Sequence, residues 1–187
     1  MSKGEQLRDR TAAAIIDSAA TILAERGEAA SMEEIASSAG IGRATLYRYF
    51  PNREELLRAM AAASVQELAA RIKEADLEAV SFEEAIARLA RALIATGSKY
   101  LALGPDSAKY TDAYPGFDIE VTEPIRALFR CAIADGSLRE DFSPGILMDL
   151  FSGLIKGALN ATVSERRGTE ETAAAVSTLF LHGVCSS

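Results

Sequence analysis

Apolar side chains recur three and four positions apart along almost the whole chain, which is the spacing of one face of an α-helix. The first such stretch predicts a helix over residues 7–26, and Gly27 follows it as a stop signal. Its apolar positions are Ile15, Ile16, Ala19, Ala20, Ile22 and Leu23. No segment alternates between apolar and polar residues for long enough to predict a strand. The pattern therefore predicts an all-α fold of about nine helices.

Two short helices are expected next, over residues 31–39 and 43–50. Ser31 and Glu34 have the spacing of a capping box, which begins the first of them. Gly40 can take the left-handed backbone conformation that ends a helix. Two short helices joined by a turn that contains glycine form a helix-turn-helix.

The rest of the chain also has helical periodicity, interrupted by a looser stretch over residues 104–116 that holds two prolines and two glycines. We expect a boundary at the start of the fourth helix, with a head domain over residues 1–52 and a helical body over residues 53–187. The further helices are expected over residues 53–74, 82–103, 119–134, 144–167 and 169–185.

Length and composition describe an ordinary globular protein. The chain has 187 residues, of which 49% are hydrophobic and 25% are charged. No apolar run approaches the roughly 18 residues that span a bilayer, and the N-terminus has no apolar stretch typical of a signal peptide. A cytoplasmic protein with no membrane partner is therefore expected. Its two cysteines, Cys131 and Cys185, are interpreted as buried thiols.

Charge is distributed unevenly along the chain. The formal net charge is −7. Residues 1–59 hold eight basic and nine acidic residues, whereas residues 60–187 hold twelve basic and eighteen acidic ones. Residues 42–53 include three arginines and no acid. The acidity therefore lies in the body, and one short stretch of the head is locally basic, as expected of a surface that binds phosphates.

The second short helix meets the physical demands of DNA reading. One of its faces must be apolar so that the head holds it rigidly, and Leu46 and Phe50 lie four positions apart on such a face. The other face needs side chains that reach base edges and phosphates in the major groove. The residues left for that face and its flanks are Arg43, Ala44, Thr45, Tyr47, Arg48 and Tyr49.

The head resembles the TetR (tetracycline-repressor) family over residues 8–60. The resemblance rests on Ile35-Ala36, Ala39-Gly40-Ile41, Thr45-Leu46-Tyr47-Arg48-Tyr49-Phe50 and Arg53-Glu54-Glu55-Leu56-Leu57. It implies a three-helix head, a fourth helix that joins head to body, and a homodimer on a near-palindromic, double-stranded operator. It also implies repression that a small-molecule effector relieves.

The same resemblance assigns roles to individual residues. Arg43, Thr45, Tyr47 and Tyr49 match positions that usually face DNA in this family, and Ser31 and Arg53 match usual phosphate contacts. Tyr49 stands where the family more often has histidine, and Gly42 where it more often has a capping residue such as serine.

Two further sites are expected in the body. Aromatic residues there are candidates for an effector pocket or are plain core residues: Tyr100, Tyr110, Tyr114, Phe117, Phe129 and Phe151. The resemblance implies that the last two helices form an intersubunit four-helix bundle. The candidate dimer contacts are Phe151, Leu154, Ile155, Gly157, Leu159, Val176, Leu179 and Phe180.

Other classes of function have less to support them. An enzyme is disfavoured, because the chain has one histidine and two cysteines, no Gly-x-Ser-x-Gly motif and no phosphate-binding glycine-rich loop. His182 and Cys185 lie three positions apart, but two ligands do not make a zinc site, so we expect no metal and no cofactor. A DNA-binding regulator without an effector stays an alternative.

Overall fold

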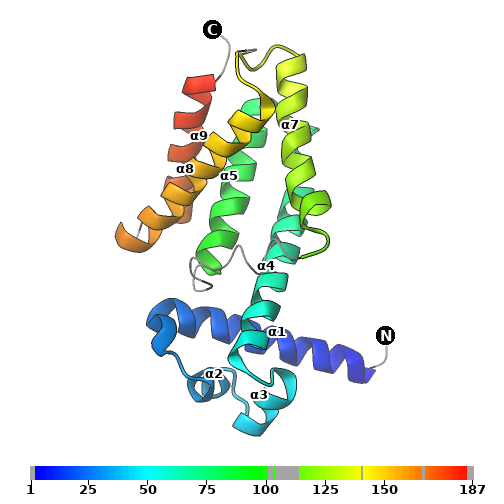
Figure 1. Ribbon diagram of the computed structural model, residues 1–187, viewed down its shortest axis with the longest axis vertical. Coiled ribbons are helices and arrows are strands. Elements are labelled where there is room, and N and C mark those ends of the chain that lie inside the picture. Colours follow the sequence, from blue (N-terminus) through cyan, green and yellow to red (C-terminus); the bar gives the residue numbers. More distant parts are fainter. Residues whose placement is uncertain (1–2, 101–102, 104–113, 140, 166, 185–187) are drawn as a thin grey trace. The chain divides into compact units, whose positions relative to one another are not determined.

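Helices form almost all of the computed structural model, which describes residues 3–100, 103, 114–139, 141–165 and 167–184. Eight α-helices and no strand are present in these ranges, so the predicted all-α class is confirmed (Figure 1). The chain divides into two units by its internal contacts. Unit 1 is Met1–Ser64 with Lys99–Ala113, and unit 2 is Val65–Ser98 with Tyr114–Ser187.

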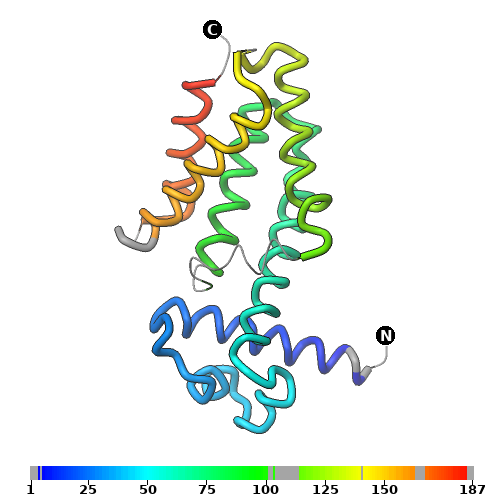
Figure 2. Tube along the Cα trace, in the orientation of Figure 1, coloured from blue at the N-terminus to red at the C-terminus, as the bar shows by residue number. Residues whose placement is uncertain are grey.

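Unit 1 is built around a helix-turn-helix. Its elements are α1 (Lys3–Arg26), the short 3-10 turn η1 (Gly27–Ala29), α2 (Met32–Ser38), α3 (Arg43–Tyr49) and the first half of α4 (Arg53–Ala75). Figure 2 traces the chain from α1 through α2 and α3 into α4. The apolar faces of these helices meet in one core that contains Ile15, Leu23, Ile35, Leu46, Leu56 and Met60, all at most 2% exposed. Tyr100 and Leu103, from a distant part of the sequence, belong to the same core.

The helix ends in unit 1 form where the capping residues predict them. The Glu34 N–H donates to Ser31 Oγ at 3.2 Å, and the Ser31 N–H donates to Glu34 Oε2 at 2.9 Å, so the capping box is complete. Gly40 has a φ of +66°, the left-handed conformation that ends α2. The Glu55 N–H donates to Asn52 Oδ1 at 2.8 Å at the start of α4.

Unit 2 holds the rest of α4 and the later helices. Its further elements are α5 (Phe82–Lys99), the π-helix η3 (Asp118–Thr122), α7 (Glu123–Ala134), α8 (Pro144–Glu165) and α9 (Thr169–Val184). α8 packs against both α7 and α9. The centre of the core is aromatic, because the ring of Phe129 lies 6.3 Å from Phe82, 6.1 Å from Phe151 and 5.8 Å from Phe180.

The first turn of the helix expected over residues 119–134 differs from the prediction. Residues 118–122 form a π-helix, and the Glu123 N–H donates to the Asp118 carbonyl five residues earlier. Pro124 follows directly, and proline has no N–H for the carbonyl four residues before it and clashes with that carbonyl. The π-helical turn therefore ends just before the residue at which the regular hydrogen-bond pattern loses a donor.

Candidate DNA-binding site

α3 has one buried face and one open face. Leu46 is 0% exposed and Phe50 is 8% exposed, so the predicted apolar anchor is confirmed. The side chains of Arg43, Ala44 and Arg48 are exposed, and those of Thr45, Tyr47 and Tyr49 are half-buried. The helix is therefore anchored on one side, and its other sides carry two exposed arginines and two half-buried tyrosines.

Arg43 has partners within the free protein. Its Nη1 lies 2.9 Å from Glu33 Oε1 of α2, and its guanidinium lies 5.4 Å from the centre of the Tyr47 ring. The side chain of Arg43 is 66% exposed, and an exposed ion pair contributes little to stability. The guanidinium can therefore leave Glu33 for a base or a phosphate at small cost.

Ser31 and Arg53 both stabilise the fold of unit 1. The Ser31 hydroxyl donates to Glu34 Oε2 at 3.0 Å while it caps α2. Arg53 Nη1 donates to the Ala30 carbonyl, and its Nη2 donates to the Gly27 carbonyl at 3.4 Å. The half-buried Arg53 side chain thus ties the start of α4 to the connection between α1 and α2. Pattern analysis missed this role because the partners are backbone atoms 23 and 26 positions away.

Arg53→Ala is expected to lower the free energy of unfolding by about 1.5 to 3 kcal/mol, because it removes a charged donor from two backbone carbonyls. Urea denaturation followed by circular dichroism measures the change. Arg48→Ala is the matched control, since Arg48 is exposed, and such a surface change is expected to stay within about 0.5 kcal/mol. Equal stabilities for the two variants would contradict a structural role for Arg53.

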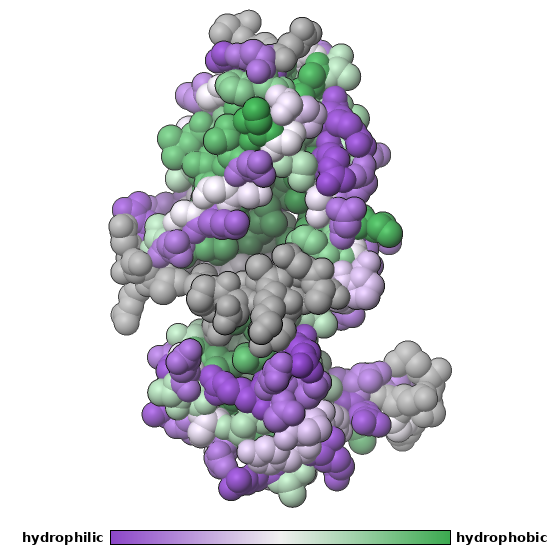
Figure 3. Space-filling model, viewed as in Figure 1, coloured by the Kyte–Doolittle hydropathy of each residue, from purple (hydrophilic) through white to green (hydrophobic). Residues whose placement is uncertain are grey.

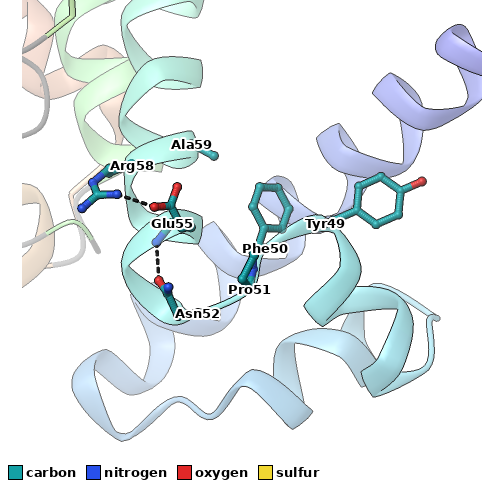
Figure 4. A pocket seen from close by; sticks show the side chains of 7 residues that line it. All are labelled: Tyr49, Phe50, Pro51, Asn52, Glu55, Arg58 and Ala59. Carbon is teal, nitrogen blue, oxygen red and sulfur yellow. Dashed lines mark hydrogen bonds and ion pairs between the residues drawn. The ribbon is translucent and has the colours of Figure 1, made fainter.

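A hollow of about 510 Å³ lies where α3 ends and α4 begins (Figure 4). Its polar lining residues already have partners close by in the sequence. Asn52 accepts a hydrogen bond from the Glu55 N–H, and Arg58 forms ion pairs with Glu54 and Glu55. In Figure 4 the Tyr49 ring points away from Asn52, Glu55 and Arg58. Because its side chains do not converge on a common point, we interpret the hollow as an uneven part of the surface beside α3.

Comparisons with known proteins agree with this geometry. A family model described as bacterial regulatory proteins, tetR family, matches residues 15–60. The HTH-type transcriptional repressor LfrR of Mycolicibacterium smegmatis is 32% identical over 159 residues, which are 82% of this chain and 80% of that protein. The chain belongs to the TetR family. It is a transcriptional regulator, and its helix-turn-helix is the DNA-binding element of that family.

Solved structures of TetR-family proteins share this fold over most of the chain. The structure of LfrR from Mycobacterium smegmatis in complex with proflavine has a TM-score of 0.67 and 25% identity, covering 95% of this chain and 99% of that one. PfmR from Thermus thermophilus has a TM-score of 0.72 and 23% identity, covering 90% and 97%. The similarity of fold therefore extends well beyond residues 15–60, into the later helices.

The aromatic residues expected to line an effector pocket do not share one environment in this TetR-family chain. Phe129 and Phe151 are 0% and 2% exposed and pack against other rings in the core of unit 2. Tyr114 and Phe117 are half-buried at the edge of that core. Tyr100 belongs to the core of unit 1. Tyr110 lies outside the described residues.

The expected dimer contacts divide between core and surface. Phe151, Ile155, Val176 and Phe180 are at most 6% exposed within one protomer, so they already pack inside unit 2. Leu154 and Leu159 are half-buried. Gly157 is exposed, and Leu179 is 67% exposed. The last two are the expected contacts that remain open to a partner.

The open surface of α8 extends beyond these candidate contacts to other residues of its apolar stripe. Ile146 and Leu150 are 50% and 51% exposed, and Gly153 is exposed beside them. On a helical projection of α8 these three residues and Gly157 lie next to one another, between the buried face and a polar face. The sequence of α8 already indicates an apolar surface of this kind, because only three of its 22 residues are charged. Figure 3 shows hydrophobic residues gathered over this part of unit 2.

No helix within the described ranges has the length and apolar character needed to cross a membrane. No group of three or more potential metal ligands was found in the same ranges. Cys185, the second member of the His182 pair, lies outside them.

Proposed function

We propose that the chain is a homodimeric repressor that acts on DNA in the cytoplasm and leaves a near-palindromic operator when a small-molecule effector binds. The observation that carries the DNA part is α3, which is anchored by Leu46 and Phe50 and leaves Arg43 and Arg48 exposed. Arginine reads guanine bidentately in the major groove, and arginine side chains also neutralise phosphates. We propose Ser31, Ala44, Thr45, Tyr47, Tyr49 and Arg53 as the neighbouring contacts.

The dimer is proposed on α8 and α9. α8 has an exposed apolar face, which is formed by Ile146, Leu150, Gly153 and Gly157. α9, which packs against α8, also exposes apolar residues, Ala175 and Leu179. A second protomer would remove this surface from water, and the small side chains would allow two helices to approach closely. One helix-turn-helix makes few contacts, so linking two heads raises the affinity for a two-part operator.

The effector is proposed to bind the body. The relative LfrR has been solved with proflavine, which supports a small-molecule ligand for this chain as well. A ligand releases the operator only if it binds the DNA-competent state more weakly. Effector and operator should then weaken each other by the same factor. A thermal-shift screen tests the alternative of a regulator without an effector, because a ligand of the folded state raises the melting temperature.

Selection of binding sites from random double-stranded DNA by the purified protein tests the proposed function directly. The expected result is a near-palindromic consensus whose half-sites lie about one or two helical turns apart. Recovery of no consensus, at a salt concentration where the protein still binds DNA, would contradict sequence-specific regulation.

Arg43→Ala is expected to weaken binding to the selected operator by about 1 to 3 kcal/mol and to relax the preference at one position in each half-site. Fluorescence anisotropy with matched and mismatched duplexes measures both effects at one salt concentration. Arg91→Ala is the control, because Arg91 lies in unit 2 and pairs with Glu170. Unchanged affinity of the Arg43 variant would show that Arg43 does not read a base.

A further inference from the structure

A cavity of about 380 Å³ opens on unit 2 between α7 and the connection from α4 to α5. Seven apolar side chains line it: Leu77 and Val80 from the connection, Phe82 from the start of α5, and Pro124, Ala127, Leu128 and Ala132 from α7. The α7 residues recur three and four positions apart, so they form one stripe of that helix. None of the aromatic residues expected to form an effector pocket lines this cavity.

The charges at this cavity all have one sign. Glu78 and Asp135 line it, and none of the lining residues that the structure describes is basic. Asp135 follows the last residue of α7, where the helix dipole is also negative. The hydroxyl and the N–H of Ser137 donate to Asp135 and hold the pKa of that carboxyl below its usual range. The rim therefore stays negative at neutral pH, while the walls are apolar.

We propose that this cavity binds a lipophilic organic cation, whose apolar body lies against Phe82 and Leu128 and whose charge faces Glu78 and Asp135. Its volume lies within the range of about 300 to 1,000 Å³ typical of small-ligand pockets. A neutral ligand would leave the two carboxylates unused, and an anion would be repelled by them. That such a cation acts as the effector rests on the proposed function. That the cavity binds the cation does not depend on it.

Cys131 provides a readout, because its exposed thiol also lines the cavity. This exposure corrects the expectation that Cys131 is buried, since the stripe of α7 that carries it faces an open cavity. In full-length protein with Cys185→Ser, Cys131 is the single thiol, and its alkylation by iodoacetamide reports whether the cavity is occupied. The probe is tetraphenylphosphonium, and its control is tetraphenylborate, an anion of nearly the same size and shape.

Tetraphenylphosphonium at nine times its Kd is expected to slow alkylation about tenfold, because the thiol reacts only in the unoccupied fraction. Tetraphenylborate at the same concentration should slow it less than about twofold. Glu78→Gln and Asp135→Asn should each weaken the cation about two- to fivefold, the range of solvent-exposed charge pairs. Asp149→Asn, an exposed acid of α8 outside the cavity, should have no effect. Ala127→Phe fills the cavity and should abolish the protection.

Equal protection by both ions, or protection that survives Ala127→Phe, would overturn the proposal. Operator titrations on the same samples test the proposed function separately. A protein that is protected by the cation but binds no operator would contradict the repressor and leave the cation site standing. A protein that binds its operator, but whose Cys131 the cation does not protect from alkylation, would contradict the cation site and leave the repressor standing.

Discussion

Gly157→Glu is expected to split the dimer and to weaken operator binding by about 100- to 10,000-fold, the gain that linking two binding modules provides. Gly157 lies in the exposed apolar face of α8, and a Cβ atom added there meets no atom within 4 Å in a single protomer. The protomer should therefore fold normally. A carboxylate buried without a partner between two protomers, by contrast, costs several kcal/mol.

Ser152→Glu is the matched control, since Ser152 is an exposed residue of the same helix that projects onto its polar face. Sedimentation at micromolar protein measures the oligomeric state, circular dichroism the helix content, and anisotropy the operator affinity. A Gly157→Glu variant that stays dimeric would place Gly157 outside the interface. A monomeric wild-type protein would contradict the proposed dimer itself.

Phe129→Ala is expected to lower the free energy of unfolding by about 3 to 5 kcal/mol, the usual cost of removing a buried aromatic side chain. Phe129 is 0% exposed and lies within 6.3 Å of the ring centres of Phe82, Phe151 and Phe180. Alanine would leave a cavity at the centre of this cluster. The loss of the ring contacts destabilises the protein further, since each aromatic pair contributes about 0.5 to 1.5 kcal/mol beyond the effect of buried area.

The same experiment separates the two interpretations of the aromatic residues. Urea denaturation of Phe129→Ala is compared with that of Phe117→Ala, because Phe117 is only half-buried. A loss of several kcal/mol for Phe129 and a much smaller one for Phe117 identifies Phe129 as a core residue. A loss below about 1 kcal/mol for Phe129, which a side chain facing an open ligand pocket would show, would contradict the core assignment.

The sequence by itself determined the fold class, the order of the helices and most of their ends. These features depend on local information: three- and four-residue spacing of apolar side chains, and a capping residue within four positions of the group that it satisfies. Ser31 with Glu34, and Gly40, act at the helix ends where they were expected. The anchor of α3 was also predictable, because Leu46 and Phe50 share one face of a short helix.

Other features were decided only by the tertiary structure, because they depend on which surfaces meet. A stripe of apolar residues predicts that a helix has buried positions, but it cannot divide them between the core of one protomer and the interface of two. Phe151 and Phe180 are therefore core residues, whereas Leu150 and Leu179 are exposed. Tyr100 joins the core of unit 1, and Arg53 binds backbone carbonyls of another connection, through contacts between positions far apart in the sequence. The cavity beside Cys131 forms where α7 lies next to the connection from α4 to α5, and no local pattern records that arrangement.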